Sequence, residues 1–298
     1  MTDHNEPREV PMQTQLPTIT DTTLVVSDLE TRFLSGGPED GTPVVFFHDG
    51  AWGGSADVTW GDVLPLAAEA GYRVIAPDFL GYGGSAKSVR VDVSPFAFRI
   101  RHTFSLLDSL GVTGPVHFVG NSFGGSIGLR AVSDPANRDR IASVTTINGT
   151  GGPFKAPDMG KMGAFDGTEE SLSKIIDLLG DTSETRAQHL EARLRWASQP
   201  GHFITMKAPH TQVPETIQAQ RPADPYPGNL ADASVPVLLV QGTADTLLEA
   251  DWPEKLSASI PTAEVARVEH GHSPNITHPR ETWELISDFL GRAKGAAN

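Results

Sequence analysis

The fold class of this 298-residue chain is decided by one stretch, VHFVGNSFGG, at residues 116–125. It begins with a short apolar run, which is typical of a strand buried on both faces of a parallel sheet. Glycines crowd its second half, and a helix is predicted to follow from Ser126 to Val132. The stretch therefore predicts a strand, a sharp turn around Ser122, and a helix that packs back against the strand.

Similar apolar runs recur along the chain, and each is followed within a few residues by Gly, Pro or Asp. They are Val44–Phe47, Arg73–Ala76, Ile141–Ile147, Val237–Val240 and Val265–Val268. Helical patterns separate them: apolar residues recur three or four apart from Pro95 to Leu110, and again from Pro279 to Leu290. Strands that alternate with helices predict a mostly parallel, twisted α/β sheet flanked by helices.

The alternation breaks after residue 149. Two helices, Ser171–Leu179 and Ser183–Ala197, are predicted between irregular passages rich in Gly and Pro. We interpret residues 150–229 as a helical cap, inserted after the sixth strand. The core domain would then comprise residues 21–149 and 230–298, and residues 1–20 would form a flexible N-terminal arm.

Composition narrows the classes of partner. Asp and Glu total 37 against 23 Lys and Arg, and this acidic balance disfavours nucleic acid and anionic membranes. The chain has no Cys, which excludes disulfides, thiolate zinc sites and a cysteine nucleophile. No apolar stretch approaches the roughly 18 residues of a membrane span, and the polar N-terminus lacks a signal-peptide pattern. We expect a cytoplasmic protein that acts on a small molecule without a metal or cofactor.

The pentad at residues 120–124 has the form G-x-S-x-G, which in a strand–turn–helix context is a nucleophile elbow. Glycines flank the serine because a Cβ there would collide with the neighbouring strand or helix. We predict Ser122 as the nucleophile. The alternative is a glycine-rich turn with an incidental serine.

A serine nucleophile needs a base and an acid, which in this context follow it in the order acid, then histidine. His272 lies after the last predicted strand and is the predicted base; His270 and His278 are competitors nearby. Asp245 follows the preceding strand and is the predicted acid, with Glu249 as the alternative. Asp245 would orient the imidazole and stabilise its cation.

Two backbone N–H groups are expected to form an oxyanion hole. One belongs to Phe123, directly after the nucleophile. The other is assigned to Gly50, in the turn after the first buried strand, because the backbone must approach the substrate closely there. The alternative is a plain strand-to-helix loop.

Together these motifs resemble the α/β-hydrolase superfamily from about residue 20 onward. His48-Asp49-Gly50 is similar to its oxyanion turn, residues 78–85 to a structural D-x-x-G-x-G-x-S stretch, and Gly271-His272 to its histidine motif. Residues 191–201 are similar to the cap helix of the meta-cleavage product hydrolases, which cleave a carbon–carbon bond in vinylogous 1,5-diketones made by aromatic ring fission.

That resemblance implies roles for two further residues. Arg193 matches the cap arginine that assists the substrate's carboxylate or keto end, and Asn121 matches the Gly-Asn-Ser form of that family. The alternative for Arg193 is an exposed helix residue. The chain departs from the family pattern at Asp49, where the oxyanion turn usually has glycine, and at Ser273, where tryptophan is usual.

The predicted function is therefore a Ser-His-Asp hydrolase that acts on a carbonyl carbon, most closely a C–C bond hydrolase of the meta-cleavage type. A carboxylesterase or lactonase with the same triad is the nearest alternative. Lyase or perhydrolase chemistry, and a ligand receptor on the same fold, also stay open. The resemblance is compatible with a homodimer or larger homo-oligomer, and the sequence leaves the oligomeric state open.

Overall fold

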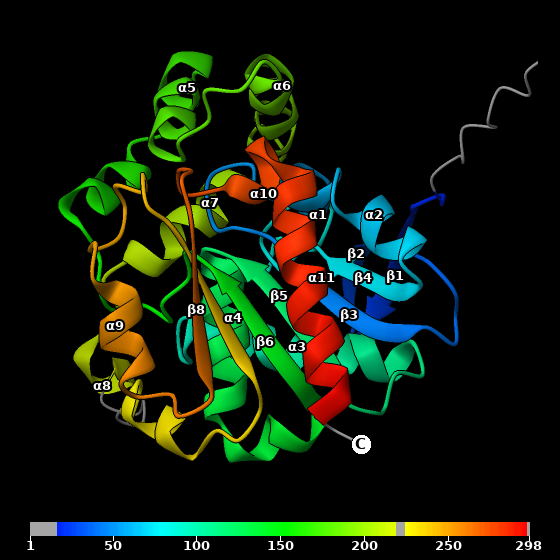
Figure 1. Cartoon of the computed structure of the whole chain (residues 1–298). Coiled ribbons are helices and arrows are strands. Elements are labelled where there is room, and N and C mark those ends of the chain that lie inside the picture. The colour runs from blue at the N-terminus through cyan, green and yellow to red at the C-terminus, as the bar shows by residue number, and fades with distance from the viewer. Residues whose placement is uncertain (1–16, 219–223, 297–298) are drawn as a thin grey trace, which may run out of the picture.

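The computed structural model describes residues 17–218 and 224–296, and within them one eight-stranded sheet has helices on both faces (Figure 1). The strands are β1 (Thr20–Val26), β2 (Leu29–Gly36), β3 (Thr42–Phe47), β4 (Tyr72–Pro77), β5 (Val116–Asn121), β6 (Ile141–Ile147), β7 (Val237–Gly242) and β8 (Ala263–Val268). Their order in the sheet is β1-β2-β4-β3-β5-β6-β7-β8. The pairs β1–β2 and β2–β4 are antiparallel, and the remaining pairs are parallel. The predicted mostly parallel sheet is confirmed.

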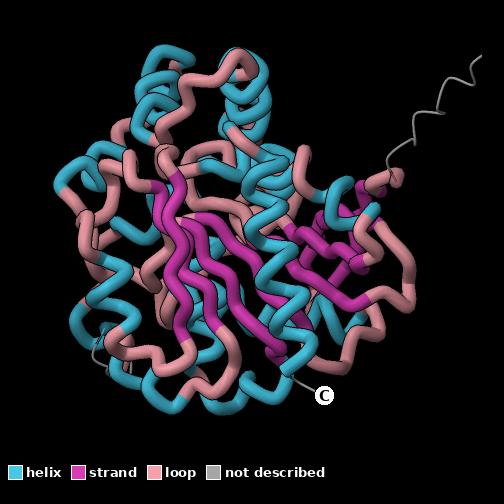
Figure 2. Tube along the Cα trace, in the orientation of Figure 1, coloured by secondary structure: helices cyan, strands magenta, loops and turns pink. Residues whose placement is uncertain are grey.

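Helices surround this sheet, as the tube in Figure 2 makes plain. Those of the core are α1 (Ala56–Trp60), α2 (Leu64–Glu69), α3 (Pro95–Ser109), α4 (Phe123–Ser133), α9 (Trp252–Ser257), α10 (Pro274–Thr277) and α11 (Pro279–Ala296), with a 3-10 helix η1 (Pro135–Arg140). In the part of the chain that the structure describes, no helix combines the length and hydropathy needed to cross a membrane.

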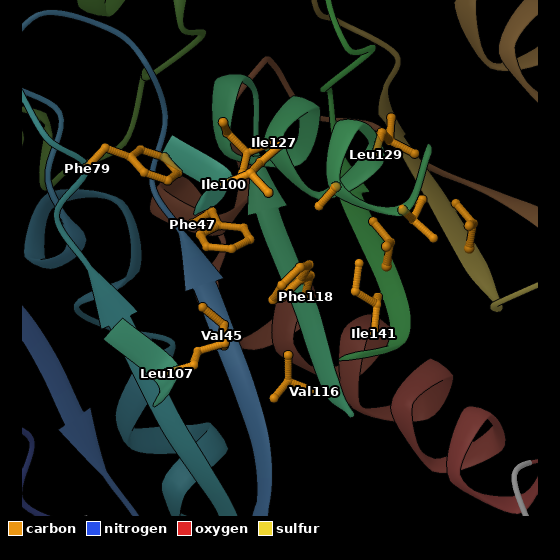
Figure 3. Packing of buried hydrophobic residues seen from close by; sticks show 14 of the residues in the cluster. Val45, Phe47, Phe79, Ile100, Leu107, Val116, Phe118, Ile127, Leu129 and Ile141 are labelled. Atoms are coloured by element: carbon orange, nitrogen blue, oxygen red, sulfur yellow. The ribbon is translucent and has the colours of Figure 1, made fainter. Parts of the chain in front are cut away.

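The strands bury both faces because successive side chains point to opposite sides. Along β3, Val45 and Phe47 pack on the face covered by α3 and α4, whereas Val44 and Phe46 pack against α1, α2 and α11. Figure 3 shows the first of these clusters, in which Phe47 lies beside Phe118 with ring centroids 4.9 Å apart. This continuous apolar packing explains why the buried strands lack an alternating polar pattern.

The segment between β6 and β7 is helical, so the predicted insertion after the sixth strand is confirmed. It contains η2 (Pro157–Gly163), α5 (Glu169–Leu178), α6 (Arg186–Ala197), α7 (His202–Lys207), η3 (Ala208–His210), α8 (Glu215–Gln218) and η4 (Gly228–Asp232). Helices α5 and α6 match the two predicted helices, and in Figure 1 they stand above the rest of the molecule. We keep the name cap for residues 150–229.

The predicted N-terminal arm, residues 1–20, lies mostly outside the described residues, which begin at residue 17. Its last residue, Thr20, already pairs with Ser35 of β2. The first strand therefore begins one residue before the predicted boundary.

One joint between cap and core depends on a buried histidine at the start of α7. The Gly53 N–H donates to His202 Nε2 at 3.1 Å, and His202 Nδ1 lies 3.2 Å from the Gly81 carbonyl oxygen. Nε2 therefore accepts and Nδ1 carries the proton, so the ring is neutral. Burial lowers the pKa of His202 to about 4. A cationic ring would lose the acceptor that holds the Gly53 turn.

Substitution of Phe118 by alanine is expected to lower the free energy of unfolding by about 3 to 5 kcal/mol, because it leaves a cavity between strand and helices. Chemical denaturation measures this. Val25 is 69% exposed, and Val25→Ala is the matched control with an expected change within about 0.5 kcal/mol. Equal effects of the two substitutions would contradict the described core.

The pKa of His202 predicts a stability loss in acid. Its folded pKa is below the ordinary value of about 6.5, so its contribution is complete above pH 6.5 and is lost as the pH falls towards 4. Between pH 7.5 and pH 5 the loss should be about 2 kcal/mol. Denaturation of the wild type and His202→Gln at both pH values tests this, because the variant lacks the titrating ring. A constant difference between the two proteins would refute the assignment.

Candidate active site

The turn between β5 and α4 presents Ser122 in a strained conformation. Its φ is 55°, a left-handed value that is uncommon for a residue other than glycine. A Cβ at Gly120 would lie 2.2 Å from the Gly124 carbonyl carbon, and one at Gly124 would lie 2.1 Å from the Phe47 carbonyl oxygen. Both glycines are therefore required for β5, β3 and α4 to approach one another.

Three side chains from separate loops form one hydrogen-bonded line at the carboxyl ends of the strands. Asp245 follows β7, and its Oδ2 lies 2.7 Å from His272 Nδ1. His272 follows β8, and its Nε2 lies 2.7 Å from Ser122 Oγ. If Nδ1–H donates to the carboxylate, Nε2 is left as the acceptor for the serine hydroxyl. The structure thus brings Ser122, His272 and Asp245 together in the arrangement of a base-activated nucleophile.

The competing residues have other partners. His270 Nε2 lies 2.8 Å from Glu281 Oε2, and the His270 ring stacks on His278 at 3.6 Å between centroids. Glu249 forms an ion pair with Lys255 at 2.5 Å. None of these side chains is hydrogen-bonded to Ser122 among the described contacts.

The two predicted oxyanion-hole residues lie against each other. A Cβ at Gly50 would be 2.7 Å from Phe123 Cβ, so only glycine allows this approach. Within residues 17–218 and 224–296, neither backbone N–H donates to an acceptor in the protein. The Tyr82 hydroxyl donates to the Gly50 carbonyl oxygen at 3.2 Å, and His48 Nδ1 lies 2.6 Å from the Asp49 carbonyl oxygen, so the peptides on both sides of Gly50 are held. Two unpaired donors next to Ser122 can stabilise a developing oxyanion.

Asn121 is not placed to bind substrate. It is fully buried, and its side-chain amide donates to the carbonyl oxygens of His272 at 3.0 Å and Ile147 at 3.2 Å. Its Oδ1 accepts from the Ser273 hydroxyl at 3.2 Å. The substrate-binding role predicted for Asn121 therefore does not hold in this structure, because its hydrogen-bonding groups hold the backbone of the histidine loop.

Sequence reasoning missed a second residue with this task. Asn148, after β6, donates to the same His272 carbonyl oxygen at 3.0 Å and accepts from the Gly242 N–H at 3.0 Å. Its φ of 48° is left-handed, which asparagine tolerates better than most residues. An asparagine directly after a buried strand was the available signal. Asn121 and Asn148 together fix the His272 loop relative to β5 and β7.

Arg193 is also placed differently from both readings of the sequence. Its side chain is fully buried, and it is directed at Asp49 rather than at the pocket or the solvent. Nη2 donates to Asp49 Oδ2 at 2.7 Å and Nη1 donates to Oδ1 at 3.2 Å. Burial raises the pKa of Asp49, but the Arg193 guanidinium outweighs it and holds that pKa well below its usual range. Asp49 is therefore the partner of the cap arginine.

A pocket of about 320 Å³ lies between the strand ends and the cap and contains Ser122 and His272. Its walls are mainly apolar, and they include Trp52, Tyr82, Phe96, Met159, Met162, Leu179, Met206, Leu247 and Leu248. Among the described residues that line it, Lys155 is the one lysine or arginine. No group of three or more His, Asp and Glu in the described part of the chain is arranged to hold a metal.

Comparisons with known proteins agree with this geometry. The chain is 28% identical over 269 residues to a 2-hydroxy-6-oxo-6-(2'-aminophenyl)hexa-2,4-dienoic acid hydrolase of Metapseudomonas resinovorans, covering 89% of this chain and 88% of that protein. It is 24% identical over 268 residues to a 2-hydroxymuconate semialdehyde hydrolase of Pseudomonas sp. strain CF600, covering 86% and 89%. The predicted resemblance to the meta-cleavage product hydrolases is confirmed.

Solved structures share the fold. The 2-hydroxy-6-oxo-6-phenylhexa-2,4-dienoate hydrolase of Rhodococcus sp. strain RHA1 superposes with a TM-score of 0.79 at 20% identity, over 92% of this chain and 99% of that one. The model of the alpha/beta hydrolase family matches residues 44–285, which include every element of the site. The chain therefore belongs to the alpha/beta hydrolase family.

Proposed function

We propose that the protein is a serine hydrolase in which Ser122 attacks a carbonyl carbon. The observation that carries this proposal is the unbroken line from Asp245 through His272 to Ser122 at the edge of an apolar pocket. A serine hydroxyl is a weak nucleophile until a base removes its proton, and His272 is the base within reach.

The reaction proceeds in two halves. As Ser122 Oγ bonds to the carbonyl carbon, its proton passes to His272, and the N–H groups of Gly50 and Phe123 hold the resulting oxyanion. The tetrahedral intermediate collapses, the leaving group takes the bonding pair and the proton from His272, and an acyl-enzyme is left. Water, deprotonated by His272, then attacks the acyl carbon and releases the acid and free Ser122.

For the substrate we propose a vinylogous 1,5-diketone acid that is cleaved at a C–C bond. The two curated relatives are hydrolases of a dienoic acid and of a semialdehyde, as their names state. Such a dienol must first ketonise, so that the bonding pair of the broken C–C bond can move onto a carbon conjugated with a ketone. The apolar wall suits an organic chain or ring, and Lys155 is the available cation for a carboxylate.

A carboxylic ester or lactone is the second candidate, and the Arg193–Asp49 pair favours it. The arginine that the family resemblance assigned to the acid end of the substrate is occupied in an ion pair. An ester needs only the triad and the oxyanion hole, since its alkoxide leaving group requires no ketonisation.

Loss of either member of the reacting pair should abolish turnover. Ser122→Ala and His272→Ala are each expected to lower kcat/KM by at least about 10³-fold with little change in fold, because nucleophile and base act as a unit. His270→Ala is the matched control, and its activity should stay within about threefold of wild type, because that ring pairs with Glu281. Steady-state kinetics and circular dichroism measure both. Full turnover by Ser122→Ala would end the proposal.

The two substrate classes are separated by parallel assays on a dienoic diketone acid and a nitrophenyl ester. We expect the diketone to have at least about a tenfold higher kcat/KM, a difference of about 1.4 kcal/mol. Lys155→Met should then raise KM for the acid and leave KM for the neutral ester unchanged. Rapid ester hydrolysis with an inert diketone would establish the second candidate instead.

A further inference from the structure

The turn that carries Gly50 is held by the side chain of Asp49. Asp49 Oδ1 accepts the Ala51 N–H at 2.8 Å, so the carboxylate closes a small loop around Gly50. Its Oδ2 accepts the Thr59 hydroxyl at 2.8 Å, which ties the same carboxylate to α1. The Asp49 carboxylate therefore holds the Gly50–Ala51 peptide, which adjoins the Asp49–Gly50 peptide that carries the Gly50 N–H.

The position of that carboxylate is in turn set by the cap. Arg193 of α6 donates to both carboxylate oxygens of Asp49, and its Nη1 also donates to the Trp52 carbonyl oxygen at 3.3 Å. One guanidinium thus holds the turn on either side of Gly50 and Ala51. A Cβ at Gly53 would lie 2.1 Å from the Arg193 carbonyl oxygen, so the backbones of turn and helix also touch.

A second pair of cap residues fixes the guanidinium itself. Arg193 Nε donates to His189 Nε2 at 2.6 Å, so the His189 proton is on Nδ1, which donates to Asp181 Oδ2 at 2.7 Å. All four side chains of this line are buried. A continuous chain of hydrogen bonds therefore runs from the cap to the oxyanion turn, through Asp181, His189, Arg193 and Asp49.

We propose that Arg193 is a positioning residue for hydrolysis: through Asp49, it sets the Gly50 N–H that stabilises the oxyanion. The inference rests on the proposed function, and it gives the cap a task besides enclosing substrate. The oxyanion hole is complete only when α6 is seated on the turn. A misplaced N–H donor stabilises the transition state less, and it leaves binding of the ground-state carbonyl largely unchanged.

The test uses a short neutral nitrophenyl ester, because a neutral substrate offers no carboxylate for an arginine to bind. Arg193→Met is expected to lower kcat at least about tenfold and to change KM less than about threefold, as for a lost transition-state contact. Arg195→Met is the matched control. It removes the same charge from the same helix at an exposed ion pair with Asp57, and its kcat should equal that of wild type.

A double-mutant cycle then tests whether Arg193 acts through Asp49. In an Asp49→Gly background, Arg193→Met should change kcat by less than about twofold, because the group it positions is gone. An equal fall in kcat in both backgrounds would overturn the inference. Unfolding midpoints are measured for each variant. If Arg193→Met does not fold, Arg193→Lys takes its place, since a point charge cannot form the two-armed contact.

Covalent labelling of Ser122 by a fluorophosphonate separates this inference from the proposed function. The probe forms an O–P bond with Ser122 and releases fluoride, so its rate depends on triad and oxyanion hole and not on the natural substrate. A wild type that is not labelled would overturn the proposed function. A labelled wild type with equally rapid labelling of the folded Arg193 variant would overturn the inference alone.

Discussion

The site depends on one steric constraint, the contact between the turn after β5 and the end of β3. Glycine at positions 120 and 124 lets the backbone of α4 approach β5 and Phe47 so closely that no Cβ fits between them. The chain can then reverse direction within a single residue, and Ser122 takes a left-handed φ at that point. The strain is local, and the buried strands on either side maintain it.

The parallel sheet brings the other residues of the site together. Its strands end at the same edge, so residues that follow β3, β5, β7 and β8 meet although the chain separates them widely. The hydrogen-bonded line of Ser122, His272 and Asp245 is one result. Asn121 and Asn148 are another, since both donate to the His272 carbonyl oxygen and hold the loop at the height where its ring reaches the serine.

The cap is joined to the site by a buried ion pair between Arg193 and Asp49. Arg193 and Asp49 are both buried, and two such groups are stable in the interior only when each satisfies the other. Their pairing joins a helix inserted after β6 to the turn after β3. The pocket beside them is mainly apolar, with Lys155 on its wall.

Much of this could be predicted from the sequence, because the determinants are local. Apolar runs of strand length and glycines at fixed spacing around Ser122 follow from the period of a strand and the sterics of a turn. Those features are properties of a few consecutive residues.

Only the tertiary structure decided which partners the polar side chains take. Arg193 and Asp49 are separated by 144 positions in the chain, and nothing near either residue indicates that they pair. The role of Asn121 likewise depends on the His272 carbonyl, 151 positions away. A buried polar group forms its hydrogen bond with the polar atom that the fold places within about 3 Å. That neighbour is set by the packing of cap on core and not by local sequence.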